Sequence, residues 1–259
     1  PHISTARMIA LCSPLNPTGT VFSKEALDSI CRMVIDENKR RSGSERPLYI
    51  MYDQVYSILC MGETRHYDPV SLYPELRDYT VFVDGMSKAF AGTGIRVGWA
   101  FGPQFITGRM RSILSHVGAW APKAEQVATA HFLSNKKAVK TFLDHFLVQI
   151  DERLESFYKG FMTLKSEGFD VDAIAPQAAI YLTVRFNLKG KKTASGKQLN
   201  SHYDITDFLC DEAGLAIVPF SSFGSAANDT WYRISVGVAR TQDIPVIIDQ
   251  LRKALSGLS

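Results

Sequence analysis

The sequence predicts an α/β protein in which a mostly parallel sheet is followed by a smaller α+β domain. Three short apolar segments, 9–12, 48–51 and 80–83, are each bounded by turn residues, which is typical of buried strands. Apolar residues at helical spacing lie between them, and this alternation of strands and helices favours a parallel sheet. After residue 165 shorter strands and helices alternate, and this pattern predicts the second domain.

The composition excludes several classes of protein. The chain has 259 residues, of which 46% are hydrophobic and 21% charged, so it can bury a sizeable core and is not disordered. No apolar run reaches the length of a membrane span, so we expect no membrane partner. With 29 Lys and Arg against 26 Asp and Glu, the net charge is only +3, and we expect no nucleic-acid partner.

Four cysteines are scattered along the chain. None lies in a C-x-x-C pair, and neither the cysteines nor the six histidines have metal-ligand spacing, so no metal site is predicted. In a chain of this length, scattered cysteines favour buried reduced thiols over disulfides, which in turn favours a cytoplasmic location. The cysteines are Cys12, Cys31, Cys60 and Cys210.

The first part of the chain has clear turn and helix signals. After the first apolar segment, Asn16-Pro17-Thr18-Gly19 predicts a turn, since Pro restricts φ and Gly admits positive φ. Ser23 is a suitable N-cap for a helix whose apolar residues follow at helical spacing. The polar segment 37–47 is expected to be a loop.

Polar residues stand at the ends of the next predicted strands. Segment 48–51 ends at Tyr52-Asp53, segment 80–83 ends at Asp84-Gly85, and a fourth strand is expected over 97–101. Open α/β sheets bind their ligands at the carboxyl ends of the strands, so we expect a site there.

A long helical pattern divides the chain into domains. It runs over 124–164 and ends at Gly168, which is long enough to leave one domain and enter another. We therefore place the first domain at 1–135, a connecting helix at 136–165 and the small domain at 166–259. Within the small domain, the expected strands are 179–186, 215–218 and 231–236, and the expected helices are 203–214 and 244–255.

The segment from Val83 to Trp99 carries the strongest chemical signal. Lys88 follows a strand end, a glycine-containing loop comes next, and Arg96 lies eight residues further on. A desolvated Lys has a lowered pKa and can form a Schiff base, and the planar fork of Arg suits a phosphate. Taken alone, the two residues are explained equally well as a surface Lys and a salt-bridged Arg.

Four segments, in order, resemble motifs of the class I/II, fold-type-I pyridoxal-phosphate (PLP) aminotransferases of the aspartate aminotransferase type. The resemblance implies a PLP-transferase type I fold, with an incomplete large domain followed by a complete small domain. The family's N-terminal part has no counterpart here, so we expect an N-terminally truncated chain. The four segments are Asn16–Gly19 (NPTG), Tyr52–Tyr56 (YDQVY), Val83–Trp99 (VDGMSKAFAGTGIRVGW) and Arg233–Gly237 (RISVG).

The resemblance implies three catalytic residues. Lys88 would hold pyridoxal 5'-phosphate as a Schiff base and, once freed, would move a proton on the substrate. Asp53 would keep the pyridinium nitrogen protonated, and Tyr56 would hydrogen-bond the phenolic oxygen of the cofactor. The ordinary alternatives are a capping Asp at a strand end and a half-buried Tyr.

Four further residues would bind cofactor or substrate. Asn16 would contact the phenolic oxygen and the substrate, and Arg96 would bind the phosphate with help from Ser87. Arg233 would form a two-point pair with the α-carboxylate of the substrate. The ordinary alternatives are a turn residue for Asn16 and a strand-end salt bridge for Arg233.

The implied function is PLP-dependent transamination between an amino acid and a 2-oxo acid, with aspartate or an aromatic amino acid as donor. Two alternatives stay open. One is lyase or synthase chemistry on the same fold with PLP, and the other is an inactive fragment or a binding module that has kept the scaffold. The resemblance also implies that the full-length enzyme is a homodimer.

A few positions depart from the family's pattern. Gln54 replaces a more usual acidic residue, and Gly85 lacks the hydroxyl that some members direct at the phosphate. Trp120 lies where many members carry small hydroxyl residues near the partner subunit. For Trp120 and Tyr181, core packing is favoured over a place at the mouth of the active site.

Overall fold

The computed structural model describes residues 2–43 and 45–259, and the chain divides into two compact units. The first contains the residues up to Leu15 together with Thr20–Asp144, and the second contains Asn16–Gly19 and His145–Ser259. The short Asn16–Gly19 turn therefore belongs to the second unit, although its sequence neighbours belong to the first. Within the described ranges, no helix is both long and apolar enough to cross a membrane.

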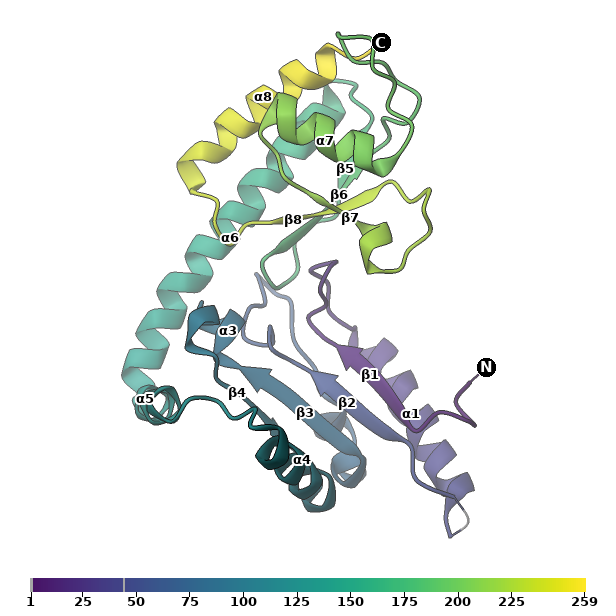
Figure 1. Ribbon diagram of the computed structural model, residues 1–259, viewed down its shortest axis with the longest axis vertical. Helices are drawn as coiled ribbons and strands as arrows, with labels where there is room; N and C mark the ends of the chain where they lie inside the picture. Colours follow the sequence, from purple (N-terminus) through teal and green to yellow (C-terminus); the bar gives the residue numbers. More distant parts are fainter. Residues whose placement is uncertain (1, 44) are drawn as a thin grey trace. The chain divides into compact units, whose positions relative to one another are not determined.

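The first unit is built on a four-stranded sheet with the order β1-β2-β3-β4 (Figure 1). The strands are β1 (Met8–Cys12), β2 (Tyr49–Asp53), β3 (Thr80–Gly85) and β4 (Gly98–Phe101). The first three are parallel, with Cys12 paired to Asp53 and Asp53 paired to Val83. β4 is antiparallel to β3, with Gly85 opposite Gly98, so β4 begins at the edge where the parallel strands end.

Helix α1 (Lys24–Arg41) packs on this sheet and closes the core of the first unit. It begins as predicted after Ser23, whose Oγ accepts the Ala26 N–H at 3.1 Å. One stripe of the helix and alternate residues of the strands are buried together, because helical and strand periods each present one apolar face. The buried residues of this core are Leu27, Cys31, Val34, Ile35, Leu48, Ile50, Tyr52, Leu76 and Phe82.

The helix continues through the polar residues as far as Arg41, so the loop predicted over 37–47 is wrong in its first part. Glu37 is 8% exposed, and its carboxylate accepts Arg41 Nε at 2.7 Å and Arg40 Nη2 at 2.8 Å. Arg41 is 1% exposed and also donates to the Ile3 carbonyl at 2.7 Å. Ion pairs spaced three and four residues apart stabilise a helical turn. The burial of Arg41 depends in addition on the distant Ile3 carbonyl, which the folded structure brings to it.

Further helices connect and follow the strands of the first unit. α4 (Gln104–Val117) lies where the sequence predicted no element, and none of its residues is buried. Its apolar side chains Phe105, Ile113 and Val117 are exposed, so the helix lacks a buried face. The other elements are α2 (Pro69–Leu72), η1 (Pro74–Tyr79), α3 (Met86–Ala89), η2 (Thr93–Ile95) and α5 (Lys123–Ser134).

The second unit contains an antiparallel sheet with the order β5-β6-β8-β7 (Figure 1). Phe161 of helix α6 packs edge-on against Phe186, which in turn contacts Tyr232, so one face of the sheet is covered by this helix. The strands are β5 (Val171–Ala173), β6 (Tyr181–Phe186), β7 (Val218–Pro219) and β8 (Trp231–Ser235). The helices are α6 (Lys136–Ser166, from His145 on), α7 (His202–Ala213), η3 (Phe220–Phe223), η4 (Thr241–Asp243) and α8 (Ile244–Ser256).

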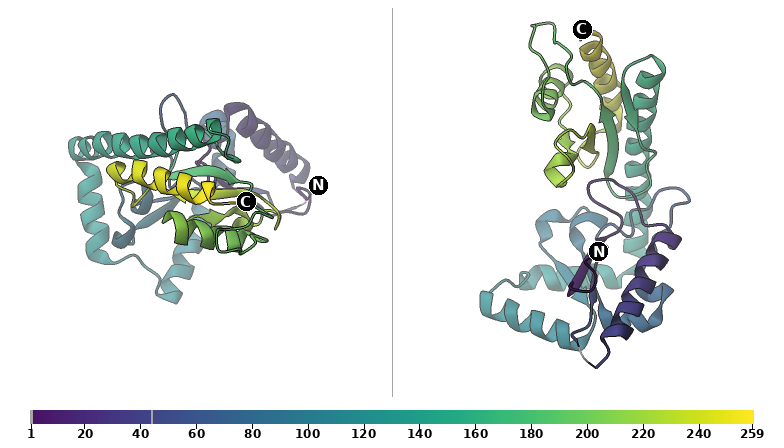
Figure 2. Two further views of the ribbon diagram at one scale, coloured as in Figure 1. Left: turned by 90° about the horizontal axis from the view of Figure 1, so that it is seen from above. Right: turned by 90° about the vertical axis from the view of Figure 1, so that its right-hand side faces the viewer.

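The helices of the second unit pack closely. α6 crosses α8 at Gly160, where a Cβ atom would lie 2.5 Å from Ile248 Cγ1, and α7 lies beside α8 (Figure 2). α7 ends as predicted at Gly214, which has a φ of 62°. The strand predicted from residue 179 begins only at Tyr181, because Ala179 has a φ of 61° and is not extended. The strand predicted over 215–218 is reduced to Val218–Pro219.

The four cysteines are free thiols, as predicted. Cys31 lies on the buried face of α1, and burial raises the pKa of its thiol to about 11. Cys12 and Cys60 are half-buried. Cys210 is exposed, so the prediction of a buried thiol is wrong there, because this position faces outward on α7.

Candidate active site

Three of the predicted site residues follow strand ends at one edge of the first sheet. Asp53 is the last residue of β2, Lys88 lies in α3 directly after β3, and Arg96 lies two residues before β4. β2 and β3 are parallel, and β4 returns from Gly85 in the opposite direction, so all three residues are placed at the same edge. Open α/β sheets bind ligands at this edge.

The loop between β3 and β4 is tight, and two glycines close it. A Cβ atom at Gly85 would lie 3.1 Å from Gly98 Cα, so a larger residue there would require the paired strands to move apart by a few tenths of an ångström. Within the loop, Ala91 and Arg96 have positive φ values of 49° and 58°, which residues with a side chain rarely adopt. Strained backbone of this kind persists where its surroundings hold it, and it is common at functional sites.

Lys88 and Ser87 are half-buried at the start of this loop. The Ala91 N–H donates to the Lys88 carbonyl at 3.2 Å, and Thr93 Oγ1 donates to the Ser87 carbonyl at 3.0 Å. Both residues are therefore tied to the chain that follows them through their backbone. Their side chains stand on a loop that hydrogen bonds to their own carbonyls hold in shape.

Arg96 lines a cavity of about 520 Å³ in the first unit. The guanidinium is exposed, and its Nη1 donates to the Thr93 carbonyl at 3.0 Å. Thr129 also lines the cavity, and its buried Oγ1 has no hydrogen-bond partner within the described residues. Trp120 lines it too and is 50% exposed, so the core-packing prediction is wrong for Trp120. The cavity thus presents hydrogen-bond donors and a positive charge.

Asp53 is half-buried and performs a capping role at the end of β2. Its Oδ1 accepts the Val55 N–H at 3.1 Å, and the Gln54 N–H donates to the Val83 carbonyl at 3.0 Å. These bonds fix the turn that carries the Asp53 carboxylate. Burial raises the pKa of the neighbouring Asp84, and the charge of Asp53 raises it further.

Tyr56 lies in the turn after β2 and is 3% exposed. The Leu59 N–H donates to its carbonyl at 2.8 Å, which closes a turn around it. The residue is buried more deeply than the half-buried tyrosine of the ordinary alternative.

The Asn16–Gly19 turn is held by hydrogen bonds to two of its carbonyls within the second unit. The Ala178 N–H donates to the Gly19 carbonyl at 2.9 Å, and Thr183 Oγ1 donates to the Thr18 carbonyl at 2.8 Å. Gly19 has a φ of 69°, and a Cβ atom there would lie 2.3 Å from the Tyr181 carbonyl oxygen. Glycine is therefore required at Gly19 both for its conformation and for the close approach of β6.

This turn brings Asn16 to Arg233. Arg233 Nη1 donates to Asn16 Oδ1 at 2.8 Å, so two residues at opposite ends of the sequence share one hydrogen bond. Arg233 lies in the middle of β8, on the face opposite the buried Tyr232 and Ile234. The resemblance implies that Asn16 contacts both cofactor and substrate, and in the structure it lies beside Arg233, the proposed substrate anchor.

Arg233 also lies between two aromatic rings. Its Cζ is 4.7 Å from the centroid of Tyr181 and 5.0 Å from the centroid of Phe223. Tyr181 is 5% exposed, as the core-packing prediction required, yet its ring faces this arginine. Phe223 was not singled out from the sequence. Its role depends on where η3 lies beside β8, and no local sequence pattern reports that contact.

No carboxylate neutralises Arg233 within the described ranges of the chain, where its one hydrogen bond is to a neutral amide oxygen. Its Nε is buried and has no hydrogen-bond partner among those residues. The strand-end salt bridge of the ordinary alternative is therefore not what this arginine forms. A half-buried guanidinium that keeps its full charge is suited to binding an anion.

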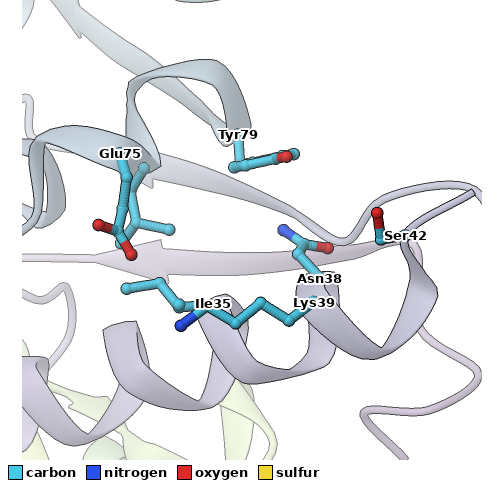
Figure 3. Close-up of a pocket in the computed structure, with 7 residues that line it drawn as sticks. Ile35, Asn38, Lys39, Ser42, Glu75 and Tyr79 are labelled. Atoms are coloured by element: carbon cyan, nitrogen blue, oxygen red, sulfur yellow. The ribbon is translucent and has the colours of Figure 1, made fainter.

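A second cavity, of about 430 Å³, lies at the other end of the first sheet (Figure 3). It is lined by Asn38 and Lys39 of α1 and by Glu75 and Tyr79 of η1. The Asn38 side chain is already committed to the Leu48 backbone, with bonds of 3.0 and 2.7 Å. Leu48 precedes β2 and Tyr79 precedes β3, so this cavity lies away from the strand ends that carry the predicted site.

No group of three or more His, Cys, Asp or Glu side chains within residues 2–43 and 45–259 is arranged to hold a metal ion. His66 is a half-buried histidine of the first unit. Its two ring nitrogens are buried without hydrogen-bond partners in the described structure, and the ring packs 5.8 Å from Tyr52.

The fold is that of the PLP-dependent aminotransferases of fold type I. It superposes on the aspartate aminotransferase from Rhizobium meliloti with a TM-score of 0.83 at 26% identity, covering 98% of this chain and 59% of that one. It also superposes on an aromatic aminotransferase from Pyrococcus horikoshii OT3 with a TM-score of 0.80 at 25% identity, covering 98% and 61%.

Residues 2–251 match the family of aminotransferase class I and II, and the chain belongs to that family. It is 28% identical to a bifunctional aspartate aminotransferase and glutamate/aspartate-prephenate aminotransferase of Petunia hybrida, over 96% of this chain and 49% of that protein. It is 30% identical to an aspartate aminotransferase of Pinus pinaster, over 98% and 47%. The chain thus spans about half the length of these curated relatives.

PLP is the cofactor of this family, and the chemistry of the donor set fits it. Lys88 supplies an amine for an aldehyde, Asp53 supplies a carboxylate for a pyridine nitrogen, and Arg96 supplies a guanidinium for a phosphate. Arg96 has no carboxylate partner in the described structure, so its charge is available to an anion.

Proposed function

We propose that the protein transfers an amino group between an amino acid and a 2-oxo acid with PLP as cofactor. One observation carries the proposal. Lys88 stands in a strained, glycine-closed loop at the edge of the sheet where Asp53 ends the neighbouring parallel strand. A lysine and a carboxylate at that edge are what an aldehyde cofactor with a basic ring nitrogen requires.

Each cofactor-binding residue has a physical role in this proposal. PLP supplies an electron sink when it is bound. Lys88 Nζ holds the cofactor covalently and, when released, carries a proton to and from the substrate carbon. The Asp53 carboxylate holds a proton on the ring nitrogen, and the buried Tyr56 phenol donates to the ring oxygen.

The remaining residues bind the charged groups. Arg96 binds the phosphate through its guanidinium, with the Ser87 hydroxyl as a second donor. Arg233 binds the α-carboxylate of the substrate, and Asn16 orients the guanidinium through the 2.8 Å bond to Nη1. The absence of a carboxylate partner for Arg233 in the described structure supports this assignment.

The names of the relatives support aspartate or an aromatic amino acid as donor, since they include aspartate, prephenate and aromatic aminotransferases. They do not favour the lyase or synthase alternative.

We also propose that the full-length enzyme is a cytoplasmic homodimer. Residues 1–135 would be part of its large domain, 136–165 its connecting helix and 166–259 its small domain. Light scattering of the full-length enzyme tests the oligomeric state.

Covalent labelling tests the role of Lys88 without requiring turnover. The chain is incubated with PLP, reduced with borohydride and digested, and the modified lysine is located by peptide mass. We expect the label on Lys88, its loss in Lys88→Ala, and no change in Lys123→Ala, which alters an exposed lysine of α5. A label spread evenly over surface lysines would contradict the proposal.

Product analysis then separates the reaction classes. A transaminase consumes aspartate or phenylalanine only when 2-oxoglutarate is present. A lyase releases ammonia without any 2-oxo acid acceptor. If Lys88 is labelled and neither reaction occurs, the chain is the inactive fragment of the third alternative.

A further inference from the structure

Two arginines of the second sheet stack on aromatic rings, and within the described residues only one of them has a carboxylate partner. Arg185 lies with its Cζ 5.9 Å from the Trp231 centroid and forms an ion pair with Asp170 at 3.6 Å. Arg233 has two rings, both closer, and within the described residues it has no carboxylate partner. The guanidinium of Arg185 is therefore held by a ring and a carboxylate, and that of Arg233 by two rings and a neutral amide.

The difference matters for anion binding. A carboxylate partner holds an arginine but cancels its charge toward a ligand. An aromatic face attracts the guanidinium through the ring quadrupole and leaves the net charge unchanged. Two rings with the neutral Asn16 amide thus orient Arg233 while preserving its attraction for a carboxylate.

The two rings are themselves firmly placed. Tyr181 begins β6 and is 5% exposed. Phe223 ends the η3 turn, which Gly224 closes with a φ of 96°, and its ring packs edge-on to Phe220 with centroids 6.4 Å apart. Phe223 is nevertheless 41% exposed, so it holds the arginine from a position at the surface of its unit.

We propose that Tyr181 and Phe223 are positioning residues that hold the Arg233 guanidinium between their rings without neutralising it. They act on the binding of the α-carboxylate through Arg233. The proposal rests on the proposed function of Arg233 as the carboxylate anchor. It extends that function by assigning a role to Phe223, which no sequence motif marks.

Substitutions at Phe223 separate the ring face from simple apolar volume. Phe223→Leu keeps an apolar side chain but removes the π-face, whereas Phe223→Tyr keeps the face. A cation–π contact of this kind corresponds to roughly a 3- to 30-fold change in an equilibrium constant. In the full-length enzyme we expect Phe223→Leu to raise the KM for the amino acid by roughly that factor with kcat within about twofold. Phe223→Tyr restores the original KM.

Trp231→Leu is the matched control. Trp231 lies on β8, the same strand as Arg233, and its replacement removes the ring that stacks on Arg185, whose charge is already neutralised by Asp170. We expect no change in the KM for the amino acid. A rise equal to that of Phe223→Leu would show that any lost ring on β8 disturbs the site, which would overturn the positioning role.

Binding of maleate to the 259-residue chain gives a readout that does not depend on turnover. The two rings should shift the Nε–Hε resonance of Arg233, and this resonance is followed while maleate is added. We expect Phe223→Leu to move the resonance toward its solvent-exposed position and to weaken maleate binding, while Phe223→Tyr does neither. Unchanged maleate affinity in Phe223→Leu overturns the positioning role.

The same titration distinguishes the two proposals. If Arg233→Lys leaves maleate affinity unchanged, Arg233 is not the carboxylate anchor and the proposed function of that residue fails. If Arg233→Lys loses maleate and Phe223→Leu keeps it, the anchor stands and only the role of the ring is wrong.

Discussion

Asn16 and Arg233 lie 217 residues apart in the sequence, and in the second unit Arg233 Nη1 donates to Asn16 Oδ1 at 2.8 Å. The bond joins a proline-containing turn to the middle of a strand. It orients a charged guanidinium through a neutral partner. A negatively charged residue at position 16 should therefore strengthen this contact and weaken the binding of an anion to Arg233.

Asn16→Asp places a carboxylate beside Arg233. The exposed pair should leave stability unchanged or raise it by about 0.2–1 kcal/mol, because two opposite charges then share the contact. The new charge competes with a ligand carboxylate, so maleate affinity should fall roughly tenfold or more. Urea unfolding and maleate titration measure the two effects. Asn16→Ala, which removes the bond without adding charge, should bind maleate more tightly than Asn16→Asp, and the reverse order contradicts the interpretation.

Gly19→Ala should destabilise the second unit. The new Cβ would lie 2.3 Å from the Tyr181 carbonyl oxygen, so the turn must move away from β6, and we expect a loss of about 2 kcal/mol or more. Gly118→Ala is the control, because Gly118 has a similar φ of 66° but nothing within 4 Å of the added Cβ. Equal losses in urea unfolding would mean that backbone conformation alone, and not the close approach, makes glycine necessary.

His66→Phe should change how stability depends on pH. Burial lowers the pKa of His66, and the charge of Asp68 opposes this only in part. The unfolded state therefore binds the proton more readily, and stability falls as the pH drops through about 6.5, the ordinary histidine value, toward the lower pKa of the folded state. His66→Phe keeps a ring against Tyr52 and removes two buried nitrogens that have no hydrogen-bond partner in the described part of the chain, so it should also stabilise by about 1 kcal/mol.

The check is thermal unfolding of both proteins between pH 7.5 and pH 5. The original protein should lose stability over this range more steeply than His66→Phe. Parallel curves would show that His66 takes up its proton equally well in the folded state.

Asp84→Asn should raise stability at neutral pH. The pKa of Asp84 is raised by burial and by the nearby Asp53 charge. The neutral carboxyl therefore stabilises the fold fully below the unfolded-state pKa of about 3.9, and this stabilisation is lost as the pH rises through the higher pKa of the folded state. Asn keeps the acceptor for the Gly85 N–H, which is now bound at 2.7 Å, and removes the charge. The gain in unfolding free energy should be present at pH 7 and vanish near pH 3.5. A gain of the same size at both pH values would count against this explanation.

Local patterns explain what could be predicted from the sequence. The helix start at Ser23, the strands that end at Asp53 and Asp84-Gly85, and the end of α7 at Gly214 depend on capping, apolar runs and glycine, which act over a few residues. The continuation of α1 through Arg41 was missed, because whether a charged residue is buried depends on distant partners such as the Ile3 carbonyl.

For the candidate site, the sequence by itself determined that Asp53, Lys88 and Arg96 follow strand ends, while the roles proposed for them and for Arg233, in the middle of β8, came from the resemblance to a family. Only the tertiary structure decided that the Asn16–Gly19 turn belongs with β6 and β8, that Arg233 has no carboxylate partner in the described structure, and that Phe223 lies against it. The physical reason is distance along the chain. Capping and periodicity act between neighbours, whereas the charge that a ligand meets is set by side chains that folding brings from hundreds of residues away.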